Sequence, residues 1–253
     1  MIKIFHTVNA GLYIDSGQTA LLIDGIHEGP SVGLSAMPEG LGEQILEGDG
    51  MFSRLDGLLF THLHVDHYDK EKVGRLLKRR PETALWGPGL ACQGVQEYQA
   101  VPGDCSFRIG EFRIAAYITV HSADVFKDDP HRSFLIENEE TGENVFISGD
   151  ALFSPDLADT IKENTDGRSI GAAFINVFHL IEEPSREFLL RLAPERLFLY
   201  HYPDPEDDTF HYLSMIRTTL RRDPLPGHTV ERLGHMQWVN LDSSEAGGPD
   251  RQD

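Results

Sequence analysis

The first part of the chain carries short apolar runs separated by turn-forming residues. Residues 2–5, 10–14 and 20–23 each form such a run, and a polar segment at residues 15–18 separates the last two. Short apolar or alternating runs bounded by Gly, Asp and Ser are typical of strands. The pattern therefore predicts three early strands, of which the second and third form a hairpin.

A Gly-rich stretch follows this hairpin, from Gly25 to Gly50. It contains two prolines and several apolar residues, and it is unusually long for a plain connection between two elements. The stretch is interpreted either as a functional loop that caps a site or as flexible surface. The pattern alone does not separate these two interpretations.

Beyond this stretch, apolar runs alternate with amphipathic segments of helical period. The predicted strands are residues 55–60, 84–86, 107–109, 112–120, 134–137, 144–147, 172–177 and 196–200, with a closing strand region at 229–241. The predicted helices are residues 70–80, 185–192 and 209–221. Hairpins followed by alternating strands and helices predict an α/β sandwich. With no repeat and no internal linker, we expect one domain over residues 1–241 and a disordered acidic tail at 242–253.

The composition narrows the class of protein. Of the 253 residues, 40% are hydrophobic and 25% are charged, as in ordinary soluble globular proteins. No apolar run approaches the roughly 20 residues that span a bilayer, and the N-terminus lacks the apolar core of a signal peptide. We therefore expect a cytoplasmic protein without a membrane partner.

The chain is strongly acidic, with a formal net charge of -19. Such a charge repels polyanions, so no general surface for nucleic acid is expected. The charge either serves solubility alone or includes local carboxylates that hold divalent cations. Cys92 and Cys105 form no C-x-x-C pair and are interpreted as structural thiols of a reducing compartment.

Three histidines and an aspartate lie within six residues, directly after the predicted strand at 55–60. His62 and His64 are two positions apart, so in an extended segment they project to the same side and can bind one ion. The segment then turns into a helix, which lets Asp66 and His67 face a second ion beside the first. Imidazole and carboxylate are the ligands expected for Zn²⁺, and Fe or Mn accept them too.

Two metal sites need more ligands than this motif supplies. His121, Asp150 and His201 each follow a predicted apolar strand at the point where it surfaces into a loop, which is where functional residues are commonly placed. His179 also lies near the end of a predicted strand and is an alternative to His201. The other histidines are expected to be ordinary polar or partly buried residues, although two of them lie near predicted loops on the metal side, His27 and His131.

With these residues in place, the chain resembles the metallo-β-lactamase-fold superfamily of metal-dependent hydrolases over almost its whole length. The resemblance implies a four-layer αβ/βα sandwich with two metals at one edge of the two sheets. It favours His201 over His179, because the last ligand of the family follows a helix. It implies one metal bound by His62, His64 and His121, and a second bound by Asp66, His67 and His201, with Asp150 bridging both.

The expected function is hydrolysis that depends on two divalent metal ions, with Zn²⁺ the first choice. A metal-bridging hydroxide, oriented by Asp66, would attack a small-molecule ester, lactone, thioester or phosphodiester. No G-x-S-x-G motif suggests a serine nucleophile. Two alternatives remain: a di-iron oxidoreductase on the same fold, in which a carboxylate usually replaces the residue equivalent to His64, and a non-catalytic metal-binding protein.

Overall fold

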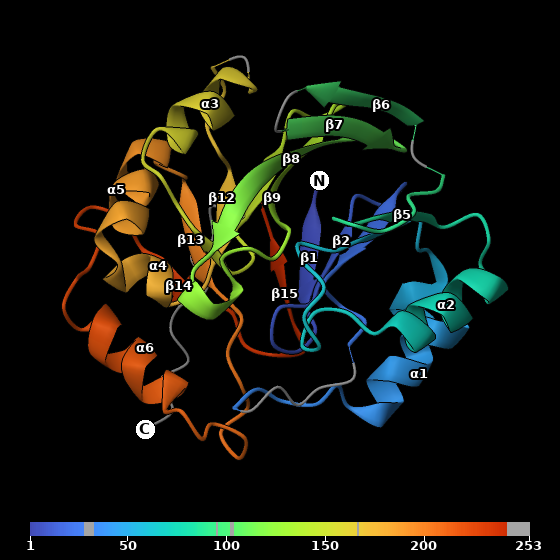
Figure 1. Ribbon diagram of the computed structural model, residues 1–253, viewed down its shortest axis with the longest axis horizontal. Helices are drawn as coiled ribbons and strands as arrows, with labels where there is room; N and C mark the ends of the chain where they lie inside the picture. Colours follow the sequence, from blue (N-terminus) through green and yellow to red (C-terminus); the bar gives the residue numbers. More distant parts are fainter. Residues whose placement is uncertain (28–32, 95, 102–103, 166, 242–253) are drawn as a thin grey trace.

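The computed structural model describes residues 1–27, 33–94, 96–101, 104–165 and 167–241. Its strands form two sheets that face each other, and helices cover the outer side of each sheet (Figure 1). The acidic tail predicted to be disordered, 242–253, lies outside the described residues, as does the part of the Gly-rich stretch at 28–32.

The first sheet has the strand order β15-β1-β2-β3-β4-β5. Strands β2 and β3 form the predicted hairpin, β1 pairs with β2 antiparallel as well, and β4 and β5 then join in parallel. The strands are β1 (Lys3–His6), β2 (Leu12–Asp15), β3 (Ala20–Ile23), β4 (Gly57–Leu59), β5 (Ala84–Trp86) and β15 (Gln237–Asn240). The outer face of this sheet is covered by α1 (Glu39–Glu47), η1 (Gly50–Ser53) and α2 (Lys70–Arg79).

The second sheet has the order β14-β13-β12-β10-β9-β8-β7-β6, and β11 pairs with β8 beside this path. Its strands are β6 (Gln96–Val101), β7 (Asp104–Ile109), β8 (Phe112–His121), β9 (His131–Asn138), β10 (Asn144–Ile147), β11 (Ala151–Leu152), β12 (Ala172–Ile175), β13 (Arg196–Leu199) and β14 (Val230–Arg232). A short η2 (Asp124–Phe126) follows β8. The remaining helices are α3 (Leu157–Glu163), α4 (Phe178–Ile181), α5 (Glu183–Leu192) and α6 (Tyr212–Leu220).

Side chains that point alternately to the two faces of the second sheet form a hydrophobic core on each side of it. In β8, Ile114 and Ala116 enter the cluster shared with the first sheet, whereas Ala115 and Tyr117 enter the cluster beneath the helices. Successive side chains of a strand point to opposite faces, so a sheet buried on both faces is apolar at nearly every position. The layers are helix, sheet, sheet and helix, which confirms the predicted αβ/βα sandwich.

Several segments differ from the sequence-based expectation, among them β6, β11, α3 and α4, where no element was predicted. The stretch at 25–50 is not a plain loop, because α1 occupies residues 39–47 and buries Leu41, Ile45 and Leu46. The closing region at 229–241 is two strands of different sheets, since the chain turns at Met236 with φ 57° between β14 and β15. None of the described helices has the length and apolar character needed to cross a bilayer. Cys92 is exposed and Cys105 is buried, without a disulfide between them.

Candidate metal centre

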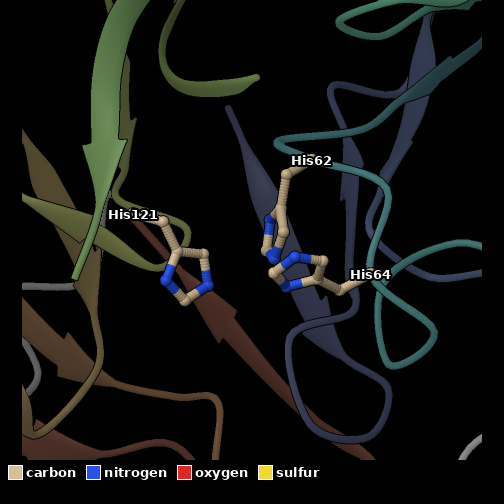
Figure 2. Close-up of side chains that lie close together, drawn as sticks. All are labelled: His62, His64 and His121. Carbon is tan, nitrogen blue, oxygen red and sulfur yellow. The ribbon is translucent and has the colours of Figure 1, made fainter. Parts of the chain in front are cut away.

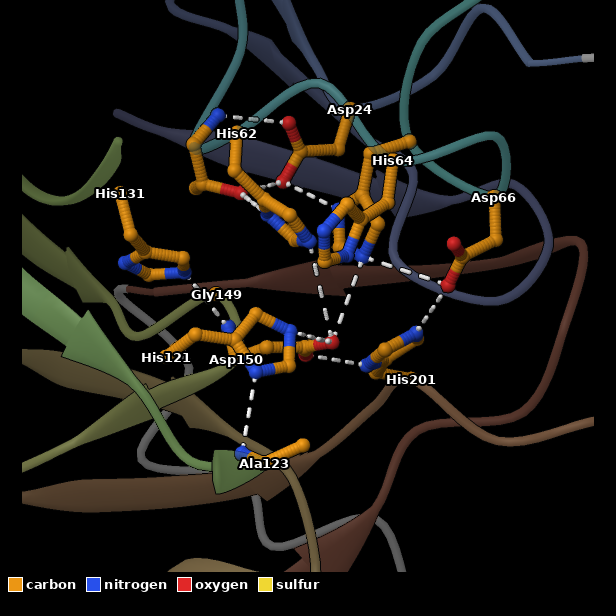
Figure 3. A network of polar contacts seen from close by, with 12 residues as sticks. Asp24, His62, His64, Asp66, His121, Ala123, His131, Gly149, Asp150 and His201 are labelled. Atoms are coloured by element: carbon orange, nitrogen blue, oxygen red, sulfur yellow. Dashed lines mark hydrogen bonds and ion pairs between the residues drawn. The ribbon is translucent and has the colours of Figure 1, made fainter. Parts of the chain in front are cut away.

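The predicted ligands meet where strands of both sheets end, at one edge of the sandwich (Figure 3). Segment 61–67 leaves β4 of the first sheet, and β8 of the second sheet ends at His121. Asp150 and His201 come soon after β10 and β13. The loops that carry the site thus rest on rigid strands from both halves of the sandwich.

His62, His64 and His121 form a first group, here called the histidine cluster. Each offers one ring nitrogen, and these nitrogens lie within 4.8 Å of one another. Figure 2 shows His62 and His64 on one side and His121 opposite them, on the strand of the other sheet. His62 and His121 are buried and His64 is partly exposed. Three imidazoles that converge in this way match the donor set of a Zn²⁺ site.

Asp66, His67, Asp150 and His201 form a second group, the carboxylate cluster, whose ligand atoms also lie within 4.8 Å of one another. Asp150 contacts both clusters. Its Oδ2 lies 3.6 Å from Nε2 of His67 and 3.6 Å from Nε2 of His121. Its Oδ1 lies 2.7 Å from Nδ1 of His201. The seven predicted residues are therefore together, with Asp150 between the two groups.

The proton positions in the first loop follow from a chain of hydrogen bonds around Thr61. The Thr61 hydroxyl donates to Oδ2 of Asp24 at 2.6 Å, and Nδ1 of His62 lies 3.0 Å from the same hydroxyl oxygen. Since the hydroxyl proton is already committed to Asp24, its oxygen accepts the Nδ1–H of His62. The lone pair of His62 is then on Nε2, the atom that faces the cluster, as a metal ligand requires.

In His64 and His121 the proton lies on Nε2, the reverse of the arrangement in His62. Nε2 of His64 lies 3.0 Å from Oδ2 of Asp129, so this nitrogen carries the proton and Nδ1 remains free to bind a cation. In His121, Nδ1 accepts the backbone N–H of Ala123 at 3.0 Å. The neutral ring therefore carries its proton on Nε2. Binding of a cation through Nε2 would move that proton to Nδ1 and break the hydrogen bond from Ala123.

Charge is balanced inside the carboxylate cluster by protons on histidine. Although burial opposes it, the charge of Asp66 raises the pKa of His67 well above its ordinary value. The charge of Asp150 likewise outweighs burial and raises the pKa of His201 to about 9. Burial instead lowers the pKa of His62 well below its ordinary value. Bound divalent cations would replace the protons of His67 and His201, which is how metal binding becomes coupled to pH.

Several buried nitrogen atoms of the two clusters make no hydrogen bond. Within the part of the chain that the structure describes, Nε2 of His62, His67 and His121 makes no hydrogen bond. An unpaired buried polar atom costs about 1–3 kcal/mol, so such atoms rarely persist without a function. Convergent nitrogen atoms without hydrogen bonds, next to two ionised carboxylates, fit one divalent cation in each cluster.

The backbone at the ends of three strands adopts the left-handed conformation. Asp24 has φ 49°, Gly149 has φ 58° and His201 has φ 56°. The His201 N–H donates to the carbonyl of Asn9 at 2.8 Å, which holds this turn against the first sheet. Left-handed residues other than Gly cost about 1–2 kcal/mol and are concentrated at functional sites. Here they turn the chain sharply enough to aim Asp24 and His201 into the centre.

His179 lies outside both clusters. Its Nε2 lies 2.7 Å from the carbonyl oxygen of Ala151, and its Nδ1 accepts the N–H of Asn176 at 3.1 Å. Both nitrogen atoms are thus used by the backbone. The structure places His201, and not His179, beside Asp66 and Asp150.

Two supporting residues were not among the predicted site residues. Asp24 directly follows the predicted strand at 20–23, and its Oδ2 lies 3.0 Å from Nδ1 of His67. His131 was expected to be ordinary, although its place near the metal side was noted. Its Nε2 accepts the backbone N–H of Asp150 at 3.0 Å, and its Nδ1 lies 2.7 Å from Oγ1 of Thr119. Burial lowers the pKa of His131 to about 3, so it stays neutral and holds this loop.

A cavity of about 300 Å³ opens onto both clusters. Its apolar walls come from Leu34, Phe126 and Phe178, and its polar lining includes Glu182 and Tyr212 besides the cluster residues. The described residues that line it include no Lys or Arg. A volume near the lower end of the range for ligand sites suits a small molecule.

No protein-family model matches this sequence, and no curated protein matches it. Solved structures do resemble the fold. A possible metal-dependent hydrolase from Veillonella parvula is 13% identical with a TM-score of 0.58, covering 94% of this chain and 99% of its own. The metallo-β-lactamase fold protein YhfI from Bacillus subtilis is 15% identical with a TM-score of 0.57, covering 94% and 98%.

A third structure, the diiron β-hydroxylase CmlA from Streptomyces venezuelae, is 16% identical with a TM-score of 0.55. The match covers 94% of this chain, which spans only about half the length of CmlA, 54% of that chain. At these identities the likeness concerns the fold. The two facing sheets with their outer helices, together with these structural matches, show that the chain has the metallo-β-lactamase fold.

Proposed function

We propose that this protein is a metal-dependent hydrolase of small molecules, with two divalent cations, Zn²⁺ by expectation, as its cofactors. The observation that carries the proposal is the pair of adjoining clusters, in which buried nitrogen atoms without hydrogen-bond partners converge on shared carboxylates. His62, His64 and His121 would hold one cation. Asp66, His67 and His201 would hold the other, and Asp150 lies where it can serve both.

Bound there, two divalent cations would lower the pKa of a water molecule and polarise the bond to be cleaved. Asp66 would orient that water. Its Oδ2 lies 3.4 Å from Nε2 of His67 and 3.3 Å from Nε2 of His201, whereas Oδ1 has no partner among the described residues. The positive charge of His67 outweighs burial and holds the pKa of Asp66 well below its usual range, so the carboxylate accepts hydrogen bonds and donates none.

Tyr212 supplies a neutral donor on the cavity wall. Its backbone N–H donates to Oδ1 of Asp208 at 2.6 Å, and this contact fixes the start of α6. Burial, aided by the charges of Asp150 and Asp66, raises the pKa of the phenol, so it stays protonated. This phenol interacts electrostatically with both carboxylates. It can therefore donate a hydrogen bond to negative charge that develops on the substrate.

The experiment that tests the proposal is metal removal followed by activity measurement. The purified protein would be analysed for metal by mass spectrometry, stripped with a chelator, and assayed against ester, lactone, thioester and phosphodiester substrates before and after Zn²⁺ is restored. We expect hydrolysis of at least one class that disappears with the metal and returns with it. Hydrolysis that survives complete metal loss would contradict the proposal.

One observation favours a second candidate, an iron-dependent oxidation. CmlA, which shares the fold, is a diiron β-hydroxylase, and a mixed histidine and carboxylate donor set also accepts iron. The intact His64 argues for the hydrolase, because the second histidine of the motif is the position that oxidoreductases of this fold usually replace. Iron in the purified protein, a ferric charge-transfer band, and consumption of dioxygen would instead support the oxidoreductase.

A further inference from the structure

Glu182 joins α4 to α5 and lines the same cavity as the metal-binding side chains. The side chain is partly buried, and its Oε2, the buried oxygen, makes no hydrogen bond within the part of the chain that the structure describes. A buried carboxylate oxygen without a partner is expensive, because it loses its hydration and gains nothing in return. The group therefore calls for a partner that the described chain does not supply.

The local structure does not account for this carboxylate. Glu182 directly precedes α5, yet its side chain makes no capping hydrogen bond to that helix. The basic residue one turn later, Arg186, directs its guanidinium to Glu183 instead. Among the described residues, neither helix capping nor an ion pair with Arg186 engages the Glu182 carboxylate, which leaves it to the cavity.

Charge is distributed unevenly along the cavity. Asp66 and Asp150 belong to the metal centre, where bound cations would more than offset them. Glu182 belongs to neither cluster, and burial raises its pKa. The N-terminus of α5 favours a carboxylate anion. With cations bound, the cavity would have a positive end at the clusters and a negative end at Glu182.

We infer that Glu182 forms a subsite for an ammonium or similar N–H donor group of the substrate. The inference rests on the proposed hydrolase function and names its substrate class: a small molecule with a primary amine, joined through an apolar body to the bond that is cleaved. The amine would pair with Glu182, and the body would contact Leu34, Phe126 and Phe178. The absence of Lys and Arg from the described lining disfavours an anionic group at this end.

Three isosteric substrates test the charge preference. They are the p-nitrophenyl esters of aminohexanoic, heptanoic and heptanedioic acid, whose chains end in an ammonium, a methyl and a carboxylate group. With metal-loaded protein we expect the highest kcat/KM for the ammonium ester and the lowest for the carboxylate ester. In Glu182→Gln, the ratio of kcat/KM between the ammonium and methyl esters should fall about ten- to a hundred-fold, mainly through KM, as loss of a charge-assisted hydrogen bond requires.

Glu183→Gln is the matched control, because it removes one negative charge from the neighbouring residue, which does not line this cavity. It should keep the wild-type ratio, and Glu182→Asp should restore part of it. A ratio that is the same in wild type and Glu182→Gln would overturn the subsite. Because each variant is judged by the ratio of two substrates in one preparation, partial misfolding does not imitate the result.

A binding measurement separates this inference from the proposed function. Hexylammonium should bind metal-loaded wild type more tightly than hexanol does in calorimetry, and Glu182→Gln should lose that preference. If no ester is hydrolysed but hexylammonium still depends on Glu182, the hydrolase proposal fails and the subsite remains. If esters are hydrolysed without regard to terminal charge and hexylammonium binds no better than hexanol, the hydrolase remains and the subsite fails.

Discussion

Oδ2 of Asp24 lies 3.0 Å from Nδ1 of His67, and both residues are fully buried. Asp24 sits at the end of β3 and His67 in the loop after β4, so the contact ties two neighbouring parallel strands together at the edge of their sheet. The same carboxylate accepts the backbone N–H of Thr61 at 2.8 Å. One buried aspartate thus orients His67 directly and His62 through Thr61, which leaves Nε2 of each ring facing the centre.

From this relationship we predict that Asp24→Asn weakens metal binding by about 10- to 100-fold, the usual cost of losing a carboxylate that orients a ligating histidine. Competition of the protein with a chromophoric chelator for Zn²⁺ would measure it. Asp49→Asn is the control, because Asp49 is exposed and its side chain makes no capping hydrogen bond. Equal affinities for the two variants would show that Asp24 does not orient the ligands.

The turn at Gly149 is the second structural requirement. Its φ is 58°, and a Cβ there would lie 2.8 Å from Nε2 of His131 and 2.9 Å from Cβ of Thr61. We predict that Gly149→Ala costs about 1–3 kcal/mol of unfolding free energy. It should also reduce metal affinity, because the neighbouring Asp150 moves with the loop. Urea unfolding and Zn²⁺ competition would measure the two effects.

Gly17→Ala separates backbone strain from this crowding. Gly17 also has a positive φ, 92°, but nothing lies within 4 Å of a Cβ placed there. Its substitution should lower the free energy of unfolding by about 1 kcal/mol and leave metal affinity unchanged. If Gly149→Ala behaves like Gly17→Ala in both measurements, close packing at Gly149 is not what fixes the position of Asp150.

The ligands were predictable from the sequence because they lie at the ends of predicted strands or in the loops that follow, where functional side chains are commonly placed. The motif at 62–67 also concentrates unusual residues in a short segment. His179 could be ranked below His201 only by resemblance, since both follow predicted strands. The two histidines differ because both ring nitrogens of His179 contact the backbone of Ala151 and Asn176. The local sequence pattern does not encode these contacts.

Other features depend on contacts between segments far apart in the chain. Glu182 and Tyr212 come from α4–α5 and α6, and nothing in their local sequence shows that both line one cavity with Asp66. Helix α1 was missed because glycines interrupt its apolar pattern, while Leu41, Ile45 and Leu46 obtain their burial from the sheet and from α2. Tertiary packing of that kind overrides a weak local preference.

Tyr212 gives a kinetic prediction. If its hydroxyl donates to charge that develops on the substrate, Tyr212→Phe should lower kcat by roughly 10²-fold or more with little change in KM, because the interaction strengthens only in the transition state. Steady-state kinetics on whichever substrate the metal-loaded enzyme hydrolyses would measure it. A rise in KM at unchanged kcat would instead assign the hydroxyl to substrate binding. Metal content should match that of the wild type, since Tyr212 lies in neither cluster.

His179 gives a prediction for stability against pH. Nδ1 accepts one backbone hydrogen bond and Nε2 donates another, so only the neutral ring satisfies both partners, and burial lowers its pKa from 6.5 to about 4. Between these values the unfolded chain binds a proton that the folded chain does not. The stabilisation is therefore complete above pH 6.5 and falls as the pH drops toward 4, by about 3 kcal/mol in total. In His179→Gln this contribution should vanish, at the cost of lower stability at neutral pH. Urea unfolding at several pH values would measure the free energy of unfolding of His179→Gln and of a control, His228→Gln, which replaces a partly exposed histidine. If the free energy of unfolding changes equally with pH in the two variants, His179 is not the source of the pH dependence.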